Sequence, residues 1–288
     1  KKEHNTPKTA FFINSVNKAF TGALVMKQVE QKKLKLNDKL SKFYPQVPHA
    51  NQITIWQLLT MEAGLQGKDE SSYGTPVFKN NQAGIKYDIK HNIVFDKKQY
   101  NQRFYSSINY ILLSGVLEKV THKSYESLVK DTYIKKLGLS ETEFYWDIPK
   151  NKHIEVAVPY TKNSQGYLVP HSVFVDRVRG DLGAGSLVMS NSDLYRAMSA
   201  ILNGEIIKPS SIQTVYAPAD PAKYNAGFYN FPDFHSSNGS GDGYTTYYRI
   251  SNDTRDVLVV QSNYPVKDYF KVREICNDLM ENLIKSPS

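Results

Sequence analysis

A single cysteine, Cys276, occurs among the 288 residues, which excludes an internal disulfide and a cysteine metal cluster. Cys276 falls in an amphipathic C-terminal segment, where we expect it to be a small core residue. The seven histidines show no metal-ligand spacing. The sequence therefore predicts no metal and no other cofactor, and it disfavours redox chemistry.

Long apolar runs, linkers and repeats are also missing. No apolar run is long enough to span a bilayer, and the polar start at residues 1–5 has no signal-peptide pattern. No Pro/Gly/Ser-rich linker, internal repeat or low-complexity tract interrupts the chain. We therefore expect one compact domain over residues 1–288.

Acidic residues are fewer than basic ones. With 36 Lys and Arg against 28 Asp and Glu, the formal net charge is +8, which favours a polyanionic neighbour. Nucleic acid, anionic lipid and a phosphate-containing wall polymer all fit that description. Nucleic acid is disfavoured, because the lysines are dispersed and no nucleic-acid motif is present.

The stretch over residues 11–24 predicts a buried lead-in followed by a helix whose first turn carries Ser15 and Lys18. Residues three apart on a helix share a face, so the serine hydroxyl and the lysine amine can form a hydrogen bond. This pairs a nucleophile with a base. The alternative is a serine that caps the helix, with a solvated lysine one turn later. A second Ser-x-x-Lys, at Ser127 and Lys130, lies in an ordinary amphipathic segment and is interpreted as structural.

Residues 104–107 form an aromatic, hydroxyl-rich turn before a strongly apolar helix over residues 109–121. Such a turn can direct Tyr105 into a cleft, where a desolvated phenol near ammonium groups can act as a base or a proton relay. A core tyrosine hydrogen-bonded to backbone is the alternative.

The remaining segments predict an α+β protein of two lobes. A helical lobe covers about residues 20–222, and a sheet lobe with the C-terminal helix covers about residues 223–288. The expected elements are helices over 19–31, 53–61 (closed by Gly64), 194–203 and 266–285; loops with a short helix over 66–92, which could hold specificity loops; a hairpin of 155–160 with 166–170; a glycine-rich turn over 179–187; and strands over 225–231, 243–250 and 256–262.

Three short motifs follow one another along the chain: Ser15-x-x-Lys18, Tyr105-Ser106-Ser107, and Ser237-Asn238-Gly239-Ser240 just before a strand. In this order they resemble the signature of the penicillin-binding-protein and class C β-lactamase superfamily. The resemblance extends from Asn5 to the C-terminus. It implies an antiparallel sheet flanked by helices, with a mainly helical lobe.

Two departures from the family pattern concern the substrate. Ser107 stands where many members have asparagine, and Ser237 stands where they have lysine or histidine. The usual charged clamp for a substrate carboxylate is therefore absent. The sequence is closer to the branch of D-alanyl esterases that act on teichoic acids, whose substrate has no free terminal carboxylate. The resemblance thus implies an anionic cell-wall polymer as substrate, or alternatively a peptidoglycan peptide.

A third departure is structural. Family members begin with two strands that complete the central sheet, and this sequence starts after the place where they should be. The expectation is a sheet truncated at its N-terminal end, either trimmed or completed by a partner chain, since an open sheet edge is a hazard.

The resemblance implies a mechanism in which Ser15 attacks an ester carbonyl and Lys18 and Tyr105 move the proton. The oxyanion would lie between the backbone N–H groups of Ser15 and Ser240. Gly239, next to Ser240 in the third motif, would belong to the same binding region. The side chains expected to orient the substrate are Ser107, Ser237 and Asn238. Two alternatives stay open: a D,D-carboxypeptidase or β-lactamase-like penicillin-interactive enzyme, and a catalytically silent wall-binding protein. The resemblance also implies an extracellular position on a bacterial surface.

Overall fold

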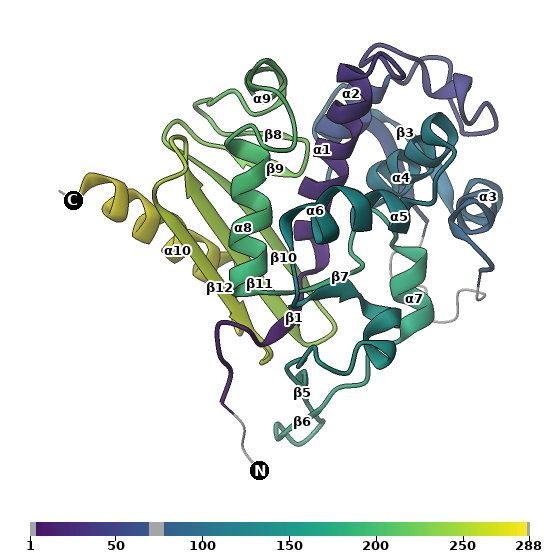
Figure 1. Cartoon of the computed structure of the whole chain (residues 1–288). Helices are drawn as coiled ribbons and strands as arrows, with labels where there is room; N and C mark the ends of the chain where they lie inside the picture. The colour runs from purple at the N-terminus through teal and green to yellow at the C-terminus, as the bar shows by residue number, and fades with distance from the viewer. Residues whose placement is uncertain (1–3, 69–77, 287–288) are drawn as a thin grey trace.

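The computed structural model describes residues 4–68 and 78–286, except the side chains of residues 176 and 177. Its largest sheet is antiparallel, with the strand order β12-β11-β10-β9-β8 (Figure 1). The strands are β8 (Lys223–Asn225), β9 (Phe228–Asn230), β10 (Phe234–Gly241), β11 (Tyr244–Ser251) and β12 (Val257–Ser262). All residues of β11 are buried, because helices cover both faces of the sheet.

Two amphipathic helices cover this sheet. Helix α10 (Tyr269–Lys285) packs on one face through Cys276 and Met280, and α8 (Asn191–Leu202) lies on the other (Figure 1). The Ser190 hydroxyl caps α8 by accepting from the Asp193 N–H at 3.2 Å. The predicted core position of Cys276 is confirmed, since the residue is 2% exposed.

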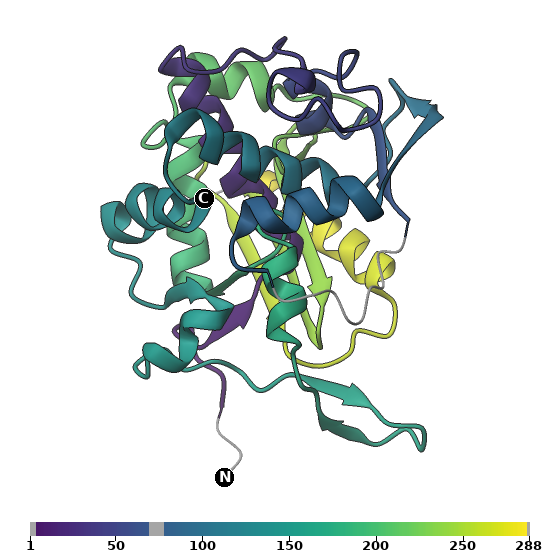
Figure 2. The same ribbon diagram turned by 90° about the vertical axis from the view of Figure 1, so that its right-hand side faces the viewer.

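Helix α1 (Asn17–Glu30) lies between the sheet and the remaining helices and is buried along most of its length (Figure 1). The other helices are α2 (Ile55–Thr60), α3 (Asn81–His91), α4 (Ile108–Thr121), α5 (Tyr125–Val129), the π-helical η3 (Lys130–Ile134), α6 (Lys135–Leu137), α7 (Val175–Gly180) and α9 (Pro209–Val215). Figure 2 looks onto this helical side, with α3 and α4 in front of the sheet. None of the helices in the described residues is long and apolar enough to cross a membrane.

In the part of the chain that the structure describes, three small sheets and three 3₁₀ turns complete the fold. The sheets are β1 (Ala10–Phe12), β7 (Leu187–Ser190) and β4 (Thr142–Phe144) in the order β1-β7-β4; β2 (Ala63–Gly67) with β3 (Ile93–Tyr100); and β5 (Tyr160–Lys162) with β6 (Leu168–Pro170). The 3₁₀ turns are η1 (Asn14–Val16), η2 (Leu40–Lys42) and η4 (Tyr145–Lys150). The predicted buried lead-in is strand β1, whose three residues are all buried.

Several predicted boundaries are wrong in the helical lobe. Residues 66–92, predicted as loops with a short helix, contain the end of β2 and the eleven-residue helix α3, which Asn80 caps by accepting from the Ala83 N–H at 2.9 Å. Residues 69–77, which fall within the predicted specificity loops, lie outside the described residues. Helix α2 ends at Met61 in the left-handed region, whereas Gly64 lies at an irregularity of β2.

Predicted strand boundaries also change. The single strand predicted over 225–231 is the hairpin β8–β9, because Ala226 and Gly227 both have positive φ and form its turn. In the hairpin predicted from 155–160 and 166–170, only Tyr160–Lys162 and Leu168–Pro170 pair as strands. The third motif lies on β10 itself, not before a strand.

One continuous apolar core spans both proposed lobes, so their division at residue 222 stays a prediction. Helix α8, from the predicted helical lobe, packs on β12 of the sheet lobe. In the described part of the chain, β12 forms an edge of its sheet. The completion of that edge by a partner chain also stays a prediction.

His235 at the start of β10 should make the folding stability depend on pH. Its ring is 4% exposed and lies 2.8 Å from the Asn230 Oδ1, and burial lowers its pKa to about 4. The unfolded chain binds a proton near pH 6.5 and the folded chain does not, so stability falls by about 2 kcal/mol between pH 7 and pH 5. Urea unfolding at both pH values should show a smaller fall for His235→Gln than for His122→Gln, whose side chain is exposed. Equal falls in the two variants would contradict this role.

Candidate active site

Ser15 lies on η1, a tight turn between β1 and α1 that is fixed by its neighbour Asn14. Asn14 adopts a positive φ of 49°, a conformation that asparagine tolerates better than most residues. Its side-chain amide donates to the Phe12 carbonyl at 3.3 Å and to the Gly241 carbonyl at 3.1 Å. The turn that presents Ser15 is thereby tied to the end of β10.

Lys18, in the first turn of α1, is 1% exposed and its amine is surrounded by three oxygen atoms. Nζ donates to the Ser15 Oγ at 2.9 Å, to the Ala184 carbonyl at 3.1 Å and to the Ser107 Oγ at 3.3 Å. The predicted contact between Ser15 and Lys18 is present. Ser107 of the second motif, predicted to orient the substrate, contacts the lysine of the first motif instead. An amine held this way can accept the serine proton while its other hydrogens stay bonded.

Tyr105 is 39% exposed and lines a pocket that also contains Ser15. It is therefore not the core tyrosine of the alternative interpretation. The Lys18 amine lies 5.0 Å from the centre of its ring. Among the described residues, no hydrogen bond joins the Tyr105 hydroxyl to Ser15 or Lys18. The ring contact is a cation–π geometry, and proton relay by Tyr105 stays a prediction.

The third motif lies beside η1 because Gly239 on β10 has no side chain. A Cβ on Gly239 would fall 2.1 Å from the Ile13 carbonyl and 3.0 Å from the Ser15 nitrogen. Strand β9 pairs with β10 only at His235 and Ser236, so the rest of that side of β10 is left to η1. Only glycine permits this approach between strand and turn.

The geometry of the β10–β11 hairpin orients the backbone of Ser240. Its turn residues Asp242 and Gly243 both have positive φ, and Gly241 pairs with Tyr244 across the turn. In such a two-residue hairpin the flanking pair is hydrogen-bonded, and the pattern alternates along the strands. The N–H of Ser240, one residue further, therefore points away from β11. This is the orientation that an oxyanion donor needs.

Ser237 and Asn238 are held by other parts of the protein. The Ser237 hydroxyl donates to the Gly227 carbonyl at 3.0 Å. The Asn238 Oδ1 accepts from the buried guanidinium of Arg249 at 2.8 Å. Both residues line the pocket that contains Ser15. Their hydrogen bonds to Gly227 and Arg249 fix the shape of this pocket, and both residues can also contact a substrate.

A pocket of about 370 Å³ joins these residues. Of the predicted site residues, it is lined by Ser15, Tyr105, Ser237, Asn238 and Ser240. The residues that sequence reasoning missed are Tyr224, Gly227, Tyr229, Tyr269, Phe270 and Arg273. The signal available for them was the high number of tyrosines, which does not say which ones meet in space. Burial raises the pKa of Tyr224, Tyr229 and Tyr269, so these phenols stay protonated at neutral pH.

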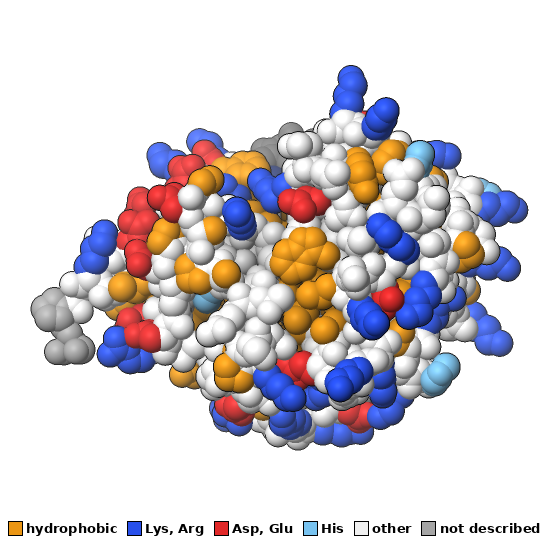
Figure 3. All heavy atoms as spheres, turned by 90° about the horizontal axis from the view of Figure 1, so that it is seen from above, with side chains coloured by type: hydrophobic (Ala, Val, Ile, Leu, Met, Phe, Trp, Pro, Cys, Tyr) orange, Lys and Arg blue, Asp and Glu red, His pale blue; other side chains and the backbone are white. Residues whose placement is uncertain are grey.

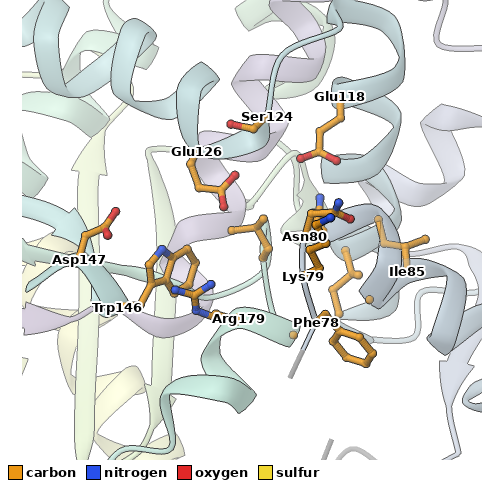
Figure 4. Close-up of a pocket in the computed structure, with 15 residues that line it drawn as sticks. Phe78, Lys79, Asn80, Ile85, Glu118, Ser124, Glu126, Trp146, Asp147 and Arg179 are labelled. Carbon is orange, nitrogen blue, oxygen red and sulfur yellow. The ribbon is translucent and has the colours of Figure 1, made fainter. Parts of the chain in front are cut away.

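The described residues also contain a second pocket of about 300 Å³, on the helical side and without Ser15 (Figure 4). Glu118 and Glu126 point toward it, and the Arg179 guanidinium lies 5.0 Å from the Trp146 ring.

Nowhere in residues 4–68 and 78–286 do three or more His, Cys, Asp or Glu side chains form a group that could hold a metal ion. On the face drawn in Figure 3, basic side chains are widely spread, and acidic ones form a group at the left and lie scattered among the basic ones elsewhere.

Comparisons with known proteins identify the family of the chain. The family model described as Beta-lactamase matches residues 1–275. Teichoic acid D-alanine hydrolase of Staphylococcus aureus is 30% identical over 287 residues, which cover 96% of this chain and 68% of that protein. A putative penicillin-binding protein of Bacillus subtilis, PbpX, is 25% identical over 281 residues, covering 97% of this chain and 68% of that protein.

A solved structure shows the same fold. FmtA from Staphylococcus aureus matches this chain with a TM-score of 0.80 and 27% sequence identity, covering 96% of this chain and 75% of that one. The predicted fold class is therefore confirmed. Together with the matched family model, it shows that the chain belongs to the β-lactamase and penicillin-binding-protein family of serine hydrolases.

Proposed function

We propose that this hydrolase removes D-alanyl esters from teichoic or lipoteichoic acid through an acyl-enzyme on Ser15. The observation that carries the chemistry is the 2.9 Å contact between the Ser15 hydroxyl and the buried Lys18 amine, at a pocket of about 370 Å³. The name of the Staphylococcus aureus relative, teichoic acid D-alanine hydrolase, supports the choice of ester.

In the first half of the reaction, the Ser15 Oγ attacks the ester carbonyl and its proton passes to the Lys18 Nζ. The N–H groups of Ser15 and Ser240 stabilise the oxyanion. The tetrahedral intermediate then collapses and the bond to the polymer oxygen breaks. That oxygen takes the proton from Lys18, directly or through Tyr105, and leaves as a free hydroxyl.

In the second half, water attacks the D-alanyl ester on Ser15 with the same proton transfers in reverse order. The Ser15 hydroxyl is restored and D-alanine is released. The Ala184 carbonyl holds Lys18 in place through both halves, since it accepts from Nζ at 3.1 Å.

The third motif supports an ester substrate over a D,D-peptide. Ser237 provides a hydroxyl where family members with a carboxylate clamp have lysine or histidine, and this hydroxyl already donates to the Gly227 carbonyl. A free terminal carboxylate would therefore find no cation in the third motif, and the charged side chain that does line the described pocket, Arg273, lies on α10 instead. The polymer that we propose has its D-alanine bound as an ester and carries phosphates along its chain. With this substrate, the protein acts on a bacterial cell surface.

The test is release of free D-alanine from purified D-alanylated lipoteichoic acid, with a muropeptide ending in D-alanyl-D-alanine measured in parallel. We expect release from the polymer and little from the muropeptide. Release from the muropeptide alone would make the protein a D,D-carboxypeptidase. Release from neither would favour a catalytically silent wall-binding protein.

A further inference from the structure

Arg273, on the first turns of α10, is the residue of interest in the wall of the Ser15 pocket. Among the described residues that line this pocket, it is the one with a charged side chain, and the structure pairs it with no carboxylate there. Its guanidinium lies 5.2 Å from the Phe270 ring. The pocket therefore contains a cation that the third motif, with Ser237, does not supply.

A second arginine, on the helical side of the molecule, lies near the wall of the Ser15 pocket. Arg103, in the exposed turn before α4, has its guanidinium 5.7 Å from the centre of the Tyr229 ring. Tyr229 lines the pocket together with Arg273. The pocket wall around this tyrosine therefore receives one arginine from the helical side and one from α10.

A buried guanidinium holds this part of α10 in place. Arg249 on β11 is fully buried and donates to the Arg273 carbonyl at 3.1 Å and to the Asn277 Oδ1 at 2.6 Å. It also donates to the Asn238 Oδ1 in the third motif. One side chain therefore connects the strand of the active site with the helix that carries Arg273. Such preorganisation lowers the entropy that binding would otherwise cost.

We propose that Arg273 and Arg103, together with the Tyr229 phenol, form a subsite for the phosphodiester that neighbours the D-alanyl ester. Guanidinium groups bind phosphate oxygens through paired, charge-assisted hydrogen bonds, and a protonated phenol adds another donor. This inference rests on the proposed function, because it identifies how that same pocket recognises its polymer. The subsite selects a substrate with a negative charge near the reacting carbonyl.

The first test compares Arg273→Gln with Arg255→Gln, a matched loss of charge at the exposed turn between β11 and β12. Both variants are assayed on D-alanylated lipoteichoic acid and on D-alanine methyl ester, which has no phosphate. For Arg273→Gln, KM for the polymer should rise about tenfold, the usual loss for a charge-assisted hydrogen bond. Its kcat/KM should fall much more for the polymer than for the methyl ester. The wild-type KM for the polymer should rise with added salt more than that of the variant.

Arg255→Gln should behave as the wild type on both substrates. An unchanged polymer KM in Arg273→Gln would overturn the subsite. So would equal losses on polymer and methyl ester, because they would mean that Arg273 shapes the catalytic centre. Arg103→Gln should give a smaller rise in polymer KM, since this side chain is exposed.

The second test separates the subsite from the proposed hydrolysis. Binding of polyglycerol phosphate without D-alanine is measured by calorimetry on Ser15→Ala and on the double variant with Arg273→Gln. Weaker binding by the double variant supports the subsite even if the wild type releases no D-alanine, an outcome that would remove only the proposed esterase. Equal binding by the two proteins would overturn the subsite whatever the wild type hydrolyses.

Discussion

Replacing Ser15 by alanine should lower kcat for D-alanine release by about 10³-fold or more, because it removes the hydroxyl that lies 2.9 Å from the Lys18 amine and would form the acyl-enzyme. The change removes one oxygen from a half-buried turn, and the backbone geometry of η1 does not depend on it. We therefore expect a folded protein with an unchanged melting temperature. Release of free D-alanine and labelling by a fluorophosphonate probe measure the loss.

The chain offers a matched control for this variant in its second Ser-x-x-Lys. Ser127 lies in α5 near the Ser124 cap, and Lys130 is paired with Glu143 and Asp147 at 3.1 Å each. This lysine is committed to carboxylates, as expected of a structural match. Ser127→Ala should keep full activity and full labelling. If Ser15→Ala kept substantial activity, Ser15 would not be the nucleophile.

Replacing Lys18 by methionine should reduce kcat by about 10²-fold to 10⁴-fold, the usual range for the loss of a general base. Methionine matches the length of the buried part of the lysine, but it cannot accept the Ser15 proton. The Ala184 carbonyl loses its donor, which should lower stability by about 1–3 kcal/mol. Single-turnover acylation by a fluorophosphonate and urea unfolding measure the two effects separately.

Lys130→Met is the control for a lost lysine elsewhere. It leaves Glu143 and Asp147 without their shared cation, so stability should fall while kcat per folded molecule stays unchanged. A Lys18→Met protein that is labelled at the wild-type rate would show that another group activates Ser15. Tyr105 would then be the first residue to test.

The residues of the site come from both sides of the fold, so their relative positions depend on an intact core. Ser15 and Lys18 come from η1 and α1, while Ser240 comes from the hairpin β10–β11. Gly22 on α1 lies so close to the β8–β9 turn that a Cβ there would fall 2.4 Å from the Ala226 carbonyl. Helix and sheet are therefore in direct backbone contact beside the pocket.

Local sequence patterns predicted the parts of the site that depend on short spacing. The contact between Ser15 and Lys18 follows from a separation of three residues in one helical turn. This prediction was correct because the two residues are neighbours along the chain. The same patterns failed for α3, whose apolar positions are few.

The sequence by itself determined the family, the contact between Ser15 and Lys18, and the absence of a cation from the third motif, since each of these depends on a few adjacent residues. Only the tertiary structure decided that the third motif lies on a strand beside η1, that the Ala184 carbonyl holds Lys18, and that Arg273 lines the pocket. These depend on segments more than a hundred residues apart. Their proximity is set by core packing, which no local spacing records.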